Sequence, residues 1–213
     1  GSAVALGGDL DGDGHADLVV GAHQVDGTYE RQGAVFVYLG GPSGVDTATE
    51  RQLSSSDGQF ANDFGRSVAL IADHNGDGFP ELLVGDHFAD GGAGTAYLFY
   101  GGTTGPGMVE DEVLRADDAR AGAAYGDALG GLDLDGDGVG ELVIGAPRDS
   151  AAGPYAGAVY VKWGVEDADL DGVPADSDCD DTDPAVDAGK HGKRWRSRRC
   201  GSGRPSAAQS CQR

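Results

Sequence analysis

Three short segments of the chain carry oxygen-bearing side chains on alternate residues, a spacing that suits a hard cation. In each segment positions 1, 3, 5 and 9 are Asp, Asn or Glu, and position 6 is a glycine that permits a sharp turn. Calcium is bound by about six to eight oxygen atoms in flexible geometry, and the backbone carbonyl of position 7 can supply one of them. We therefore predict three calcium sites. Their ligands are Asp9, Asp11, Asp13, His15 and Asp17 in the first, Asp73, Asn75, Asp77, Phe79 and Glu81 in the second, and Asp133, Asp135, Asp137, Val139 and Glu141 in the third, with His15, Phe79 and Val139 acting through their carbonyls.

The charge density of these segments favours a bound cation. Two carboxylates about 4 Å apart repel each other by roughly 4 kcal/mol at an effective dielectric constant near 20. Several of them gathered in one small loop without a counter-ion would therefore destabilise the fold. Solvated Asp-Gly turns are the alternative, because both residue types are also common in turns. The three-fold repetition of the pattern favours the ions.

Other metal-binding motifs fit these segments less well. An EF-hand needs a bidentate Glu at position 12 and a helix on each side, whereas position 12 here is Val20, Val84 and Ile144 in short apolar runs. The same mismatch argues against a dockerin-type loop. Magnesium is disfavoured because it requires near-ideal octahedral geometry and keeps its waters. The histidines in and near the segments do not form the three or four converging ligands that zinc requires.

The three segments are parts of an internal repeat, with offsets of 64 and 60 residues between their first aspartates. Each segment lies between two short apolar runs, and a third run follows at 33–39, 94–100 and 157–163. Weaker fourth runs lie at 50–54 and 109–114. Short runs separated by turn residues predict antiparallel blades of three or four strands, in which each acidic segment joins two neighbouring strands.

This repeat resembles the FG-GAP repeat of integrin α-subunits. The FG pair is Phe64-Gly65, with Tyr125-Gly126 as a conservative variant. The GAP triplet is Gly145-Ala146-Pro147, with Gly21-Ala22-His23 and Gly85-Asp86-His87 as looser copies. The resemblance implies an all-β fold, a partial β-propeller of three four-stranded antiparallel blades, whereas propellers of this family usually have seven. Because residues 1–4 match residues 65–68, we expect the chain to start inside a blade.

The C-terminal part of the chain has a different composition. Residues 166–188 are rich in aspartate and contain Cys179, and they resemble thrombospondin type-three repeats and related bacterial Asp-rich metal-binding motifs. That resemblance implies further calcium ligands at Asp167, Asp169 and Asp171, with a disordered acidic linker as the alternative. Residues 189–213 hold eight Lys and Arg and no acid. We predict a basic disordered tail there, with an arm for nucleic acid or an anionic surface as the alternative.

These patterns divide the chain into three regions. Residues 1–165 form three blades, approximately 1–60, 61–121 and 122–165, of which the first and last are incomplete. The acidic calcium-binding motif occupies 166–188, and the basic tail occupies 189–213. We expect the blades to complete a larger propeller or to self-associate, because propellers of about four to eight blades bury their sheets by closing a ring.

Composition excludes several functions for the blades. The formal net charge is −21, and residues 1–188 alone carry −29, since they contain all 36 acids and only seven basic residues. Such a region repels nucleic acid and anionic membranes. No apolar run approaches the roughly 18 residues of a membrane helix. We therefore predict no nucleic-acid partner and no membrane insertion in this chain.

The predicted function is binding without catalysis. Neither Gly-x-Ser-x-Gly nor His-Glu-x-x-His occurs, and paired acids that recur in three blades fit structural sites better than one catalytic centre. The FG-GAP resemblance implies an extracellular or cell-surface module for adhesion that binds a protein or carbohydrate, mainly on the face opposite its structural calcium ions. An accessory domain of a secreted hydrolase or polysaccharide-degrading enzyme, and a structural stalk, are the alternatives.

Overall fold

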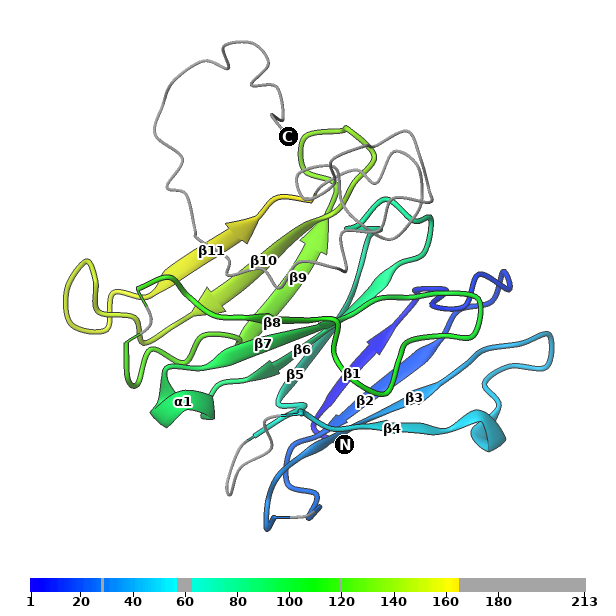
Figure 1. Cartoon of the computed structure of the whole chain (residues 1–213), viewed down its shortest axis with the longest axis horizontal. Helices are drawn as coiled ribbons and strands as arrows, with labels where there is room; N and C mark the ends of the chain where they lie inside the picture. Colours follow the sequence, from blue (N-terminus) through cyan, green and yellow to red (C-terminus); the bar gives the residue numbers. More distant parts are fainter. Residues whose placement is uncertain (28, 57–62, 119, 165–213) are drawn as a thin grey trace, which may run out of the picture.

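The computed structural model describes residues 1–27, 29–56, 63–118 and 120–164, so the predictions for residues 166–213 lie outside it. Three antiparallel sheets follow one another along this part of the chain (Figure 1). The first contains β1 (Ala3–Leu6), β2 (Leu18–Ala22), β3 (Ala34–Tyr38) and β4 (Arg51–Leu53); the second β5 (Ser67–Ile71), β6 (Glu81–Asp86), β7 (Thr95–Phe99) and β8 (Glu112–Leu114); the third β9 (Ala128–Leu132), β10 (Glu141–Ala146) and β11 (Ala158–Lys162). The described helices are short, a 3-10 turn at Thr47–Thr49 and α1 (Ala89–Gly92), and none is long and apolar enough to span a membrane.

Strand order within each sheet follows the sequence, as expected for blades made of successive hairpins. In the first two sheets the order is β1-β2-β3-β4 and β5-β6-β7-β8, and in the third β9, β10 and β11 are neighbours in that order. The first strands of the three sheets are neighbours, and β5 contacts both β1 and β9. The all-β class and the three antiparallel blades are therefore confirmed.

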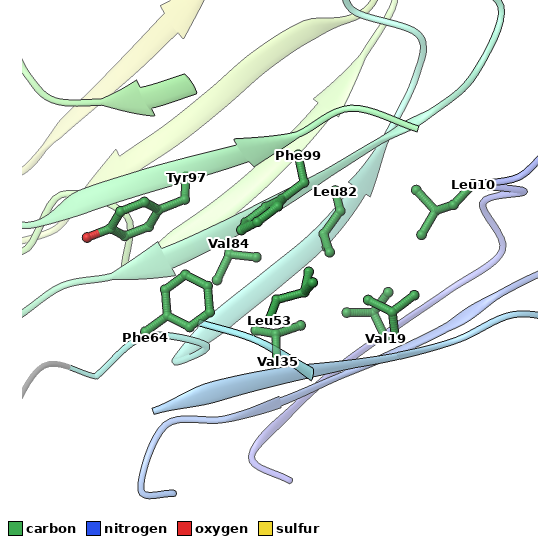
Figure 2. Close-up of a cluster of buried hydrophobic side chains, with 10 residues drawn as sticks. Leu10, Val19, Val35, Leu53, Phe64, Leu82, Val84, Tyr97 and Phe99 are labelled. Atoms are coloured by element: carbon green, nitrogen blue, oxygen red, sulfur yellow. The ribbon is translucent and has the colours of Figure 1, made fainter. Parts of the chain in front are cut away.

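The second sheet lies between the other two and is covered on both faces. Every residue of β6 and β7 is buried, whereas residues of β1 and β11 alternate between partly buried and exposed. One apolar cluster joins the first sheet to the second through Val19, Val35 and Leu53 on one side and Leu82, Val84 and Phe99 on the other (Figure 2). A second cluster, which includes Leu83, Leu98, Leu142 and Ile144, joins the second sheet to the third.

The aromatic residue of each FG pair anchors the start of a blade. Phe64 is fully buried, and its ring centroid lies 5.3 Å from that of Tyr97 in an edge-to-face arrangement (Figure 2). Its backbone forms a parallel bridge with Gly33 of the preceding blade, and Tyr125 forms the same bridge with Gly94. Gly33 has φ +84°, and a Cβ atom there would lie 2.2 Å from the Phe64 carbonyl oxygen, so only glycine permits this approach.

Both outer sheets expose apolar side chains on the face that points away from the second sheet. On β1 the exposed fractions are 59% for Val4 and 69% for Leu6. On the third sheet Val159 and Val161 of β11 and the following Trp163 are also exposed. In the second sheet the equivalent faces are covered by its neighbours.

We predict that Phe64→Ala lowers the free energy of unfolding by about 3–5 kcal/mol, because it removes a fully buried ring between two blades. Urea unfolding monitored by circular dichroism measures this loss. Phe88→Ala is the matched control, since Phe88 is 48% exposed and should cost much less. Equal losses for the two variants would contradict the anchoring role of Phe64.

We also expect the chain to self-associate, because its outer sheets expose apolar faces and unpaired strand edges. Light scattering at increasing protein concentration in millimolar calcium measures the mass. Replacing Val159 and Val161 with threonine should reduce association, because both side chains belong to the exposed face of β11. A chain that stays monomeric at every concentration would contradict this expectation.

Candidate metal centres

The three acidic segments join the first and second strands of each sheet. They connect β1 to β2, β5 to β6 and β9 to β10, so all three lie at the same end of their hairpins. The buried strands hold the ends of each segment in register; Ile71 pairs with Glu81 and Leu132 pairs with Glu141 across the hairpins. The sequence prediction of hairpin loops is therefore confirmed.

Within the second loop, carboxylate and amide oxygens accept hydrogen bonds from the loop's own backbone. Asp73 accepts from the N–H groups of Gly76 at 2.7 Å and Gly78 at 2.8 Å. Asn75 accepts from the N–H of Asp77 at 3.2 Å, and Asp77 accepts from that of Phe79 at 2.9 Å. These bonds hold the side chains on the inside of the turn.

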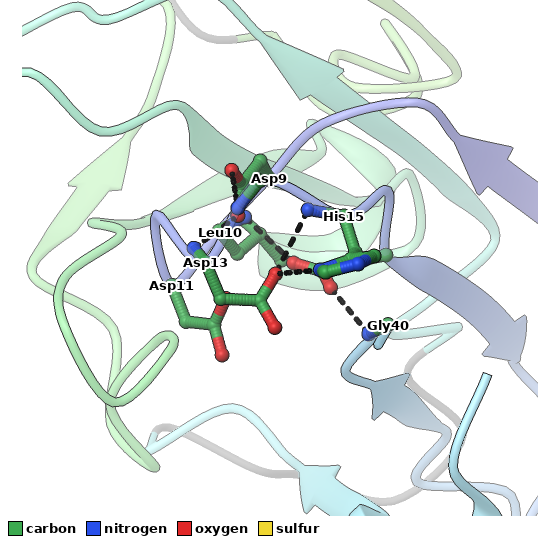
Figure 3. Close-up of polar contacts among 8 residues, drawn as sticks. Asp9, Leu10, Asp11, Asp13, His15 and Gly40 are labelled. Carbon is green, nitrogen blue, oxygen red and sulfur yellow. Dashed lines mark hydrogen bonds and ion pairs between the residues drawn. The ribbon is translucent and has the colours of Figure 1, made fainter. Parts of the chain in front are cut away.

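The first and third loops repeat this arrangement. Asp133 accepts from the N–H groups of Gly136 and Gly138 at 2.6 and 3.1 Å, as Asp73 does in the second loop. In the first loop Asp9 accepts from the N–H groups of Asp13 and Gly14 at 3.0 and 2.8 Å (Figure 3). In all three loops the first aspartate thus accepts two backbone N–H groups of its own turn.

The acid at position 9 is buried in the second and third loops. Glu81 and Glu141 are 0% and 1% exposed, and one oxygen of each accepts an N–H at 2.6 Å, from His74 and Leu134 respectively. The other oxygen of Glu81, Oε1, has no hydrogen-bond partner among the described residues. Burial is the main cause that raises the pKa of Glu81 to about 9, and the nearby carboxylates of Asp73 and Asp77 contribute to the same rise. A buried carboxylate oxygen without a partner is costly unless a proton or a cation compensates it.

Oxygen atoms converge in each loop closely enough to share one ion. Within each group the ligand atoms lie within 4.8 Å of one another: Asp9, Asp11 and Asp13; Asp73, Asp77 and Glu81; Asp133, Asp135 and Glu141. All these ligand atoms are hard oxygens, which suit calcium. The Oε1 atom of Glu81, which has no hydrogen-bond partner among the described residues, is the atom that a cation would compensate. The residues present therefore fit the predicted ion.

Two of the predicted carboxylate ligands in these loops fall outside the groups. Asp17 is fully buried, but its two oxygens accept N–H bonds from Leu10 at 2.6 Å and Gly40 at 2.7 Å. Asp137 accepts from the N–H of Val139 at 2.9 Å and does not join its group. The carbonyl ligands at His15, Phe79 and Val139 stay predictions, and Asp167, Asp169 and Asp171 lie outside the described residues.

One residue that sequence reasoning assigned to a loop has a structural role between blades. His74 is 2% exposed, and its Nδ1 lies 2.6 Å from the Gly140 carbonyl oxygen of the third loop. Gly140 in turn donates its N–H to the Asp73 carbonyl at 2.5 Å. The second and third loops are thus joined directly. The sequence signal for this role was the residue type at the second position of the loop. It is histidine here and leucine in the other two copies, Leu10 and Leu134.

The FG-GAP repeat family model matches residues 1–38, 64–99 and 125–161, which together make up about half of the chain. The chain belongs to the FG-GAP repeat family. Similar proteins include integrin alpha-7 of Mus musculus, 37% identical over 150 residues that cover 68% of this chain and 12% of that protein. Integrin alpha-PS2 of Drosophila melanogaster is 35% identical over 153 residues, covering 65% and 11%. This FG-GAP chain therefore corresponds to about an eighth of the length of these relatives.

We predict that Glu81→Gln alters the pH dependence of stability when a chelator removes divalent cations. The folded pKa of about 9 lies above the ordinary value of 4.5, so the wild-type contribution is full below pH 4.5 and is lost as the pH rises toward 9. The loss is up to roughly 1.4 kcal/mol for each pH unit. Gln cannot ionise, so urea unfolding from pH 5 to 8 should show a flatter profile for the variant. Parallel profiles would contradict the burial argument.

Proposed function

We propose that this FG-GAP chain is part of an extracellular, calcium-stabilised β-propeller that acts in adhesion by binding a protein or carbohydrate partner. The observation that carries the proposal is the convergence of carboxylates in three equivalent hairpin loops, together with the orphaned oxygen of buried Glu81. The similarity to integrin α-chains supports the adhesion role and the extracellular setting.

Calcium would have a structural role in this proposal. The ligands would be Asp9, Asp11, Asp13 and Asp17, then Asp73, Asn75, Asp77 and Glu81, then Asp133, Asp135, Asp137 and Glu141. A bound ion supplies positive charge where the acids repel one another and where a buried carboxylate oxygen lacks a donor. The loop residues themselves fix the hairpin, and the contacts of the second loop with Gly140 extend that order to the neighbouring blade.

The proposal assigns no catalytic role to the acids. Each group lies at the tip of a hairpin, and three equivalent copies serve three blades. Catalytic sites are single constellations in which acids have different roles set by different environments. The same equivalence that supports structural ions therefore disfavours an enzyme.

Partner binding is assigned to the opposite ends of the strands. Of the seven Lys and Arg in residues 1–164, five lie there: Arg31, Arg66, Arg115, Arg120 and Arg148. Exposed aromatic side chains occur in each of the β2–β3, β6–β7 and β10–β11 connections, at Tyr29, Phe88 and Tyr155. Arginine and aromatic residues are enriched in binding interfaces, whereas the acidic hairpin end would repel most anionic surfaces.

We expect calcium to raise the melting temperature strongly. An ion that binds only the folded chain adds about 1.4 kcal/mol per site at a tenfold excess over Kd, the excess that about 1 mM calcium gives for a Kd near 10⁻⁴ M. Asp135→Ala should remove part of this gain, because Asp135 belongs to a converging group. Asp117→Ala is the matched control, since Asp117 is exposed and outside every loop group. Differential scanning calorimetry in EDTA and in millimolar calcium makes the comparison.

Equal melting temperatures in EDTA and in calcium would contradict the proposal. The affinity separates the extracellular setting from an intracellular one, because sites of extracellular modules commonly bind calcium at about 10⁻⁴–10⁻³ M. Calorimetric titration that shows filling below roughly micromolar calcium would point to an intracellular sensor or buffer. The second loop should bind most weakly, because Asn75 stands where the other loops have aspartate.

A further inference from the structure

An open pocket of about 530 Å³ lies at the end of the third sheet opposite the acidic loops. One wall is the β10–β11 connection, and the other is the segment that precedes β9. The two walls are joined by a hydrogen bond from the N–H of Arg148 to the Ala123 carbonyl at 3.1 Å. The pocket is lined by Ala121, Gly122, Arg148, Ser150, Pro154 and Tyr155.

A buried aspartate holds the β10–β11 connection in shape. Asp149 is 1% exposed, and one carboxylate oxygen accepts the N–H of Ala151 at 2.7 Å while the other accepts the Tyr160 hydroxyl at 3.2 Å. Its backbone also bonds to Ala146 at 3.1 Å and Gly157 at 2.9 Å. The pocket wall is thus organised before any ligand arrives, which lowers the entropic cost of binding.

Arg148 offers an uncommitted guanidinium to this pocket. Its side chain is exposed and forms no ion pair among the described residues, whereas Arg115 lies 2.6 Å from Asp90 and Lys162 contacts Glu112. In so acidic a chain, an arginine without a carboxylate partner is available for an external one. The guanidinium fork binds a carboxylate through two parallel hydrogen bonds.

Tyr155 supplies an aromatic surface beside the arginine. It is 80% exposed and has φ +55°, a left-handed conformation that side chains other than glycine seldom adopt. The equivalent residue of the second sheet, two positions before Gly94, is Gly92. The third repeat therefore places a large exposed ring where the backbone geometry favours glycine, next to Pro154 and the hydroxyl of Ser150.

We propose that this pocket binds an acidic saccharide, a sugar ring that carries a carboxylate. The carboxylate pairs with Arg148, the apolar face of the ring packs on Tyr155 and Pro154, and Ser150 hydrogen-bonds a sugar hydroxyl. This assignment narrows the partner class and so rests on the proposed function. A pocket whose wall is held by Asp149, and which places one guanidinium and one hydroxyl beside Tyr155 and Pro154, suits one or two sugar rings better than an extended acidic peptide.

The test titrates the full chain in millimolar calcium with trigalacturonate, and uses maltotriose and triglutamate as the neutral and peptide probes. We expect binding of trigalacturonate alone. Arg148→Gln and Tyr155→Gly should each weaken it at least about tenfold, since each removes one half of the site. Tyr155→Gly suits the left-handed backbone, so its loss of binding cannot be ascribed to strain.

Arg51→Gln and Met108→Ala are the controls, because both residues lie at the acidic end of the sheets and line no part of this pocket. Both should bind like the wild type. An equal loss in Arg51→Gln, equal affinity for triglutamate, or no binding of trigalacturonate would overturn the proposal. The melting temperature of the same samples is also measured with and without calcium. A calcium-dependent melting temperature in a sample that does not bind trigalacturonate shows that only the saccharide proposal has failed.

Discussion

Crowded carboxylates at the hairpin tips are the constraint on which the rest of this fold depends. Each loop brings acidic oxygens within 4.8 Å of one another, and Glu81 carries its carboxylate into a fully buried position beside them. In water these groups would repel one another and stay solvated. The loop backbone compensates part of the negative charge through N–H groups directed at Asp73 and its equivalents. In the proposed function a cation compensates the remainder, so the stability of the hairpin ends would depend on the ionic surroundings.

The loops matter beyond their own hairpins because their second residue reaches the next blade. Leu10 is fully buried in the cluster between the first and second sheets (Figure 2), and its carbonyl accepts the N–H of Gly102 at 2.9 Å. His74 occupies the same position in the second loop and contacts Gly140 of the third. Leu134, the third copy, is 54% exposed. The first and second loops therefore each contact two blades.

Much of this architecture could be predicted because local patterns specify it. Short apolar runs, turn glycines and alternate acids act over a few residues, so hairpins and loops were predictable from the sequence. The fourth strands were less so: β8 begins at Glu112 rather than at 109, because Asp111 accepts the N–H of Tyr100 and so ends the pairing. The hydrogen bonds of Asp17 were not predictable from the sequence either. Its two oxygens are taken by Leu10 and by Gly40, and Gly40 lies beyond β3, a contact that spacing alone does not reveal.

The two ends of the strands have different chemistry for a reason that lies in the topology. The acids at the hairpin tips can share one ion only when they converge, so the backbone there must keep the conformation of the turn. The connections at the opposite end need only span from one strand to the next, and they can carry varied side chains at equivalent positions, such as Arg31, Gly92 and Tyr155. Strands of five or six buried residues, such as β6 and β7, lie between the two ends and are too well packed to bend independently. Ordering the acidic end therefore fixes where the opposite loops are presented, and variation in those loops does not disturb the acids that stabilise the blade.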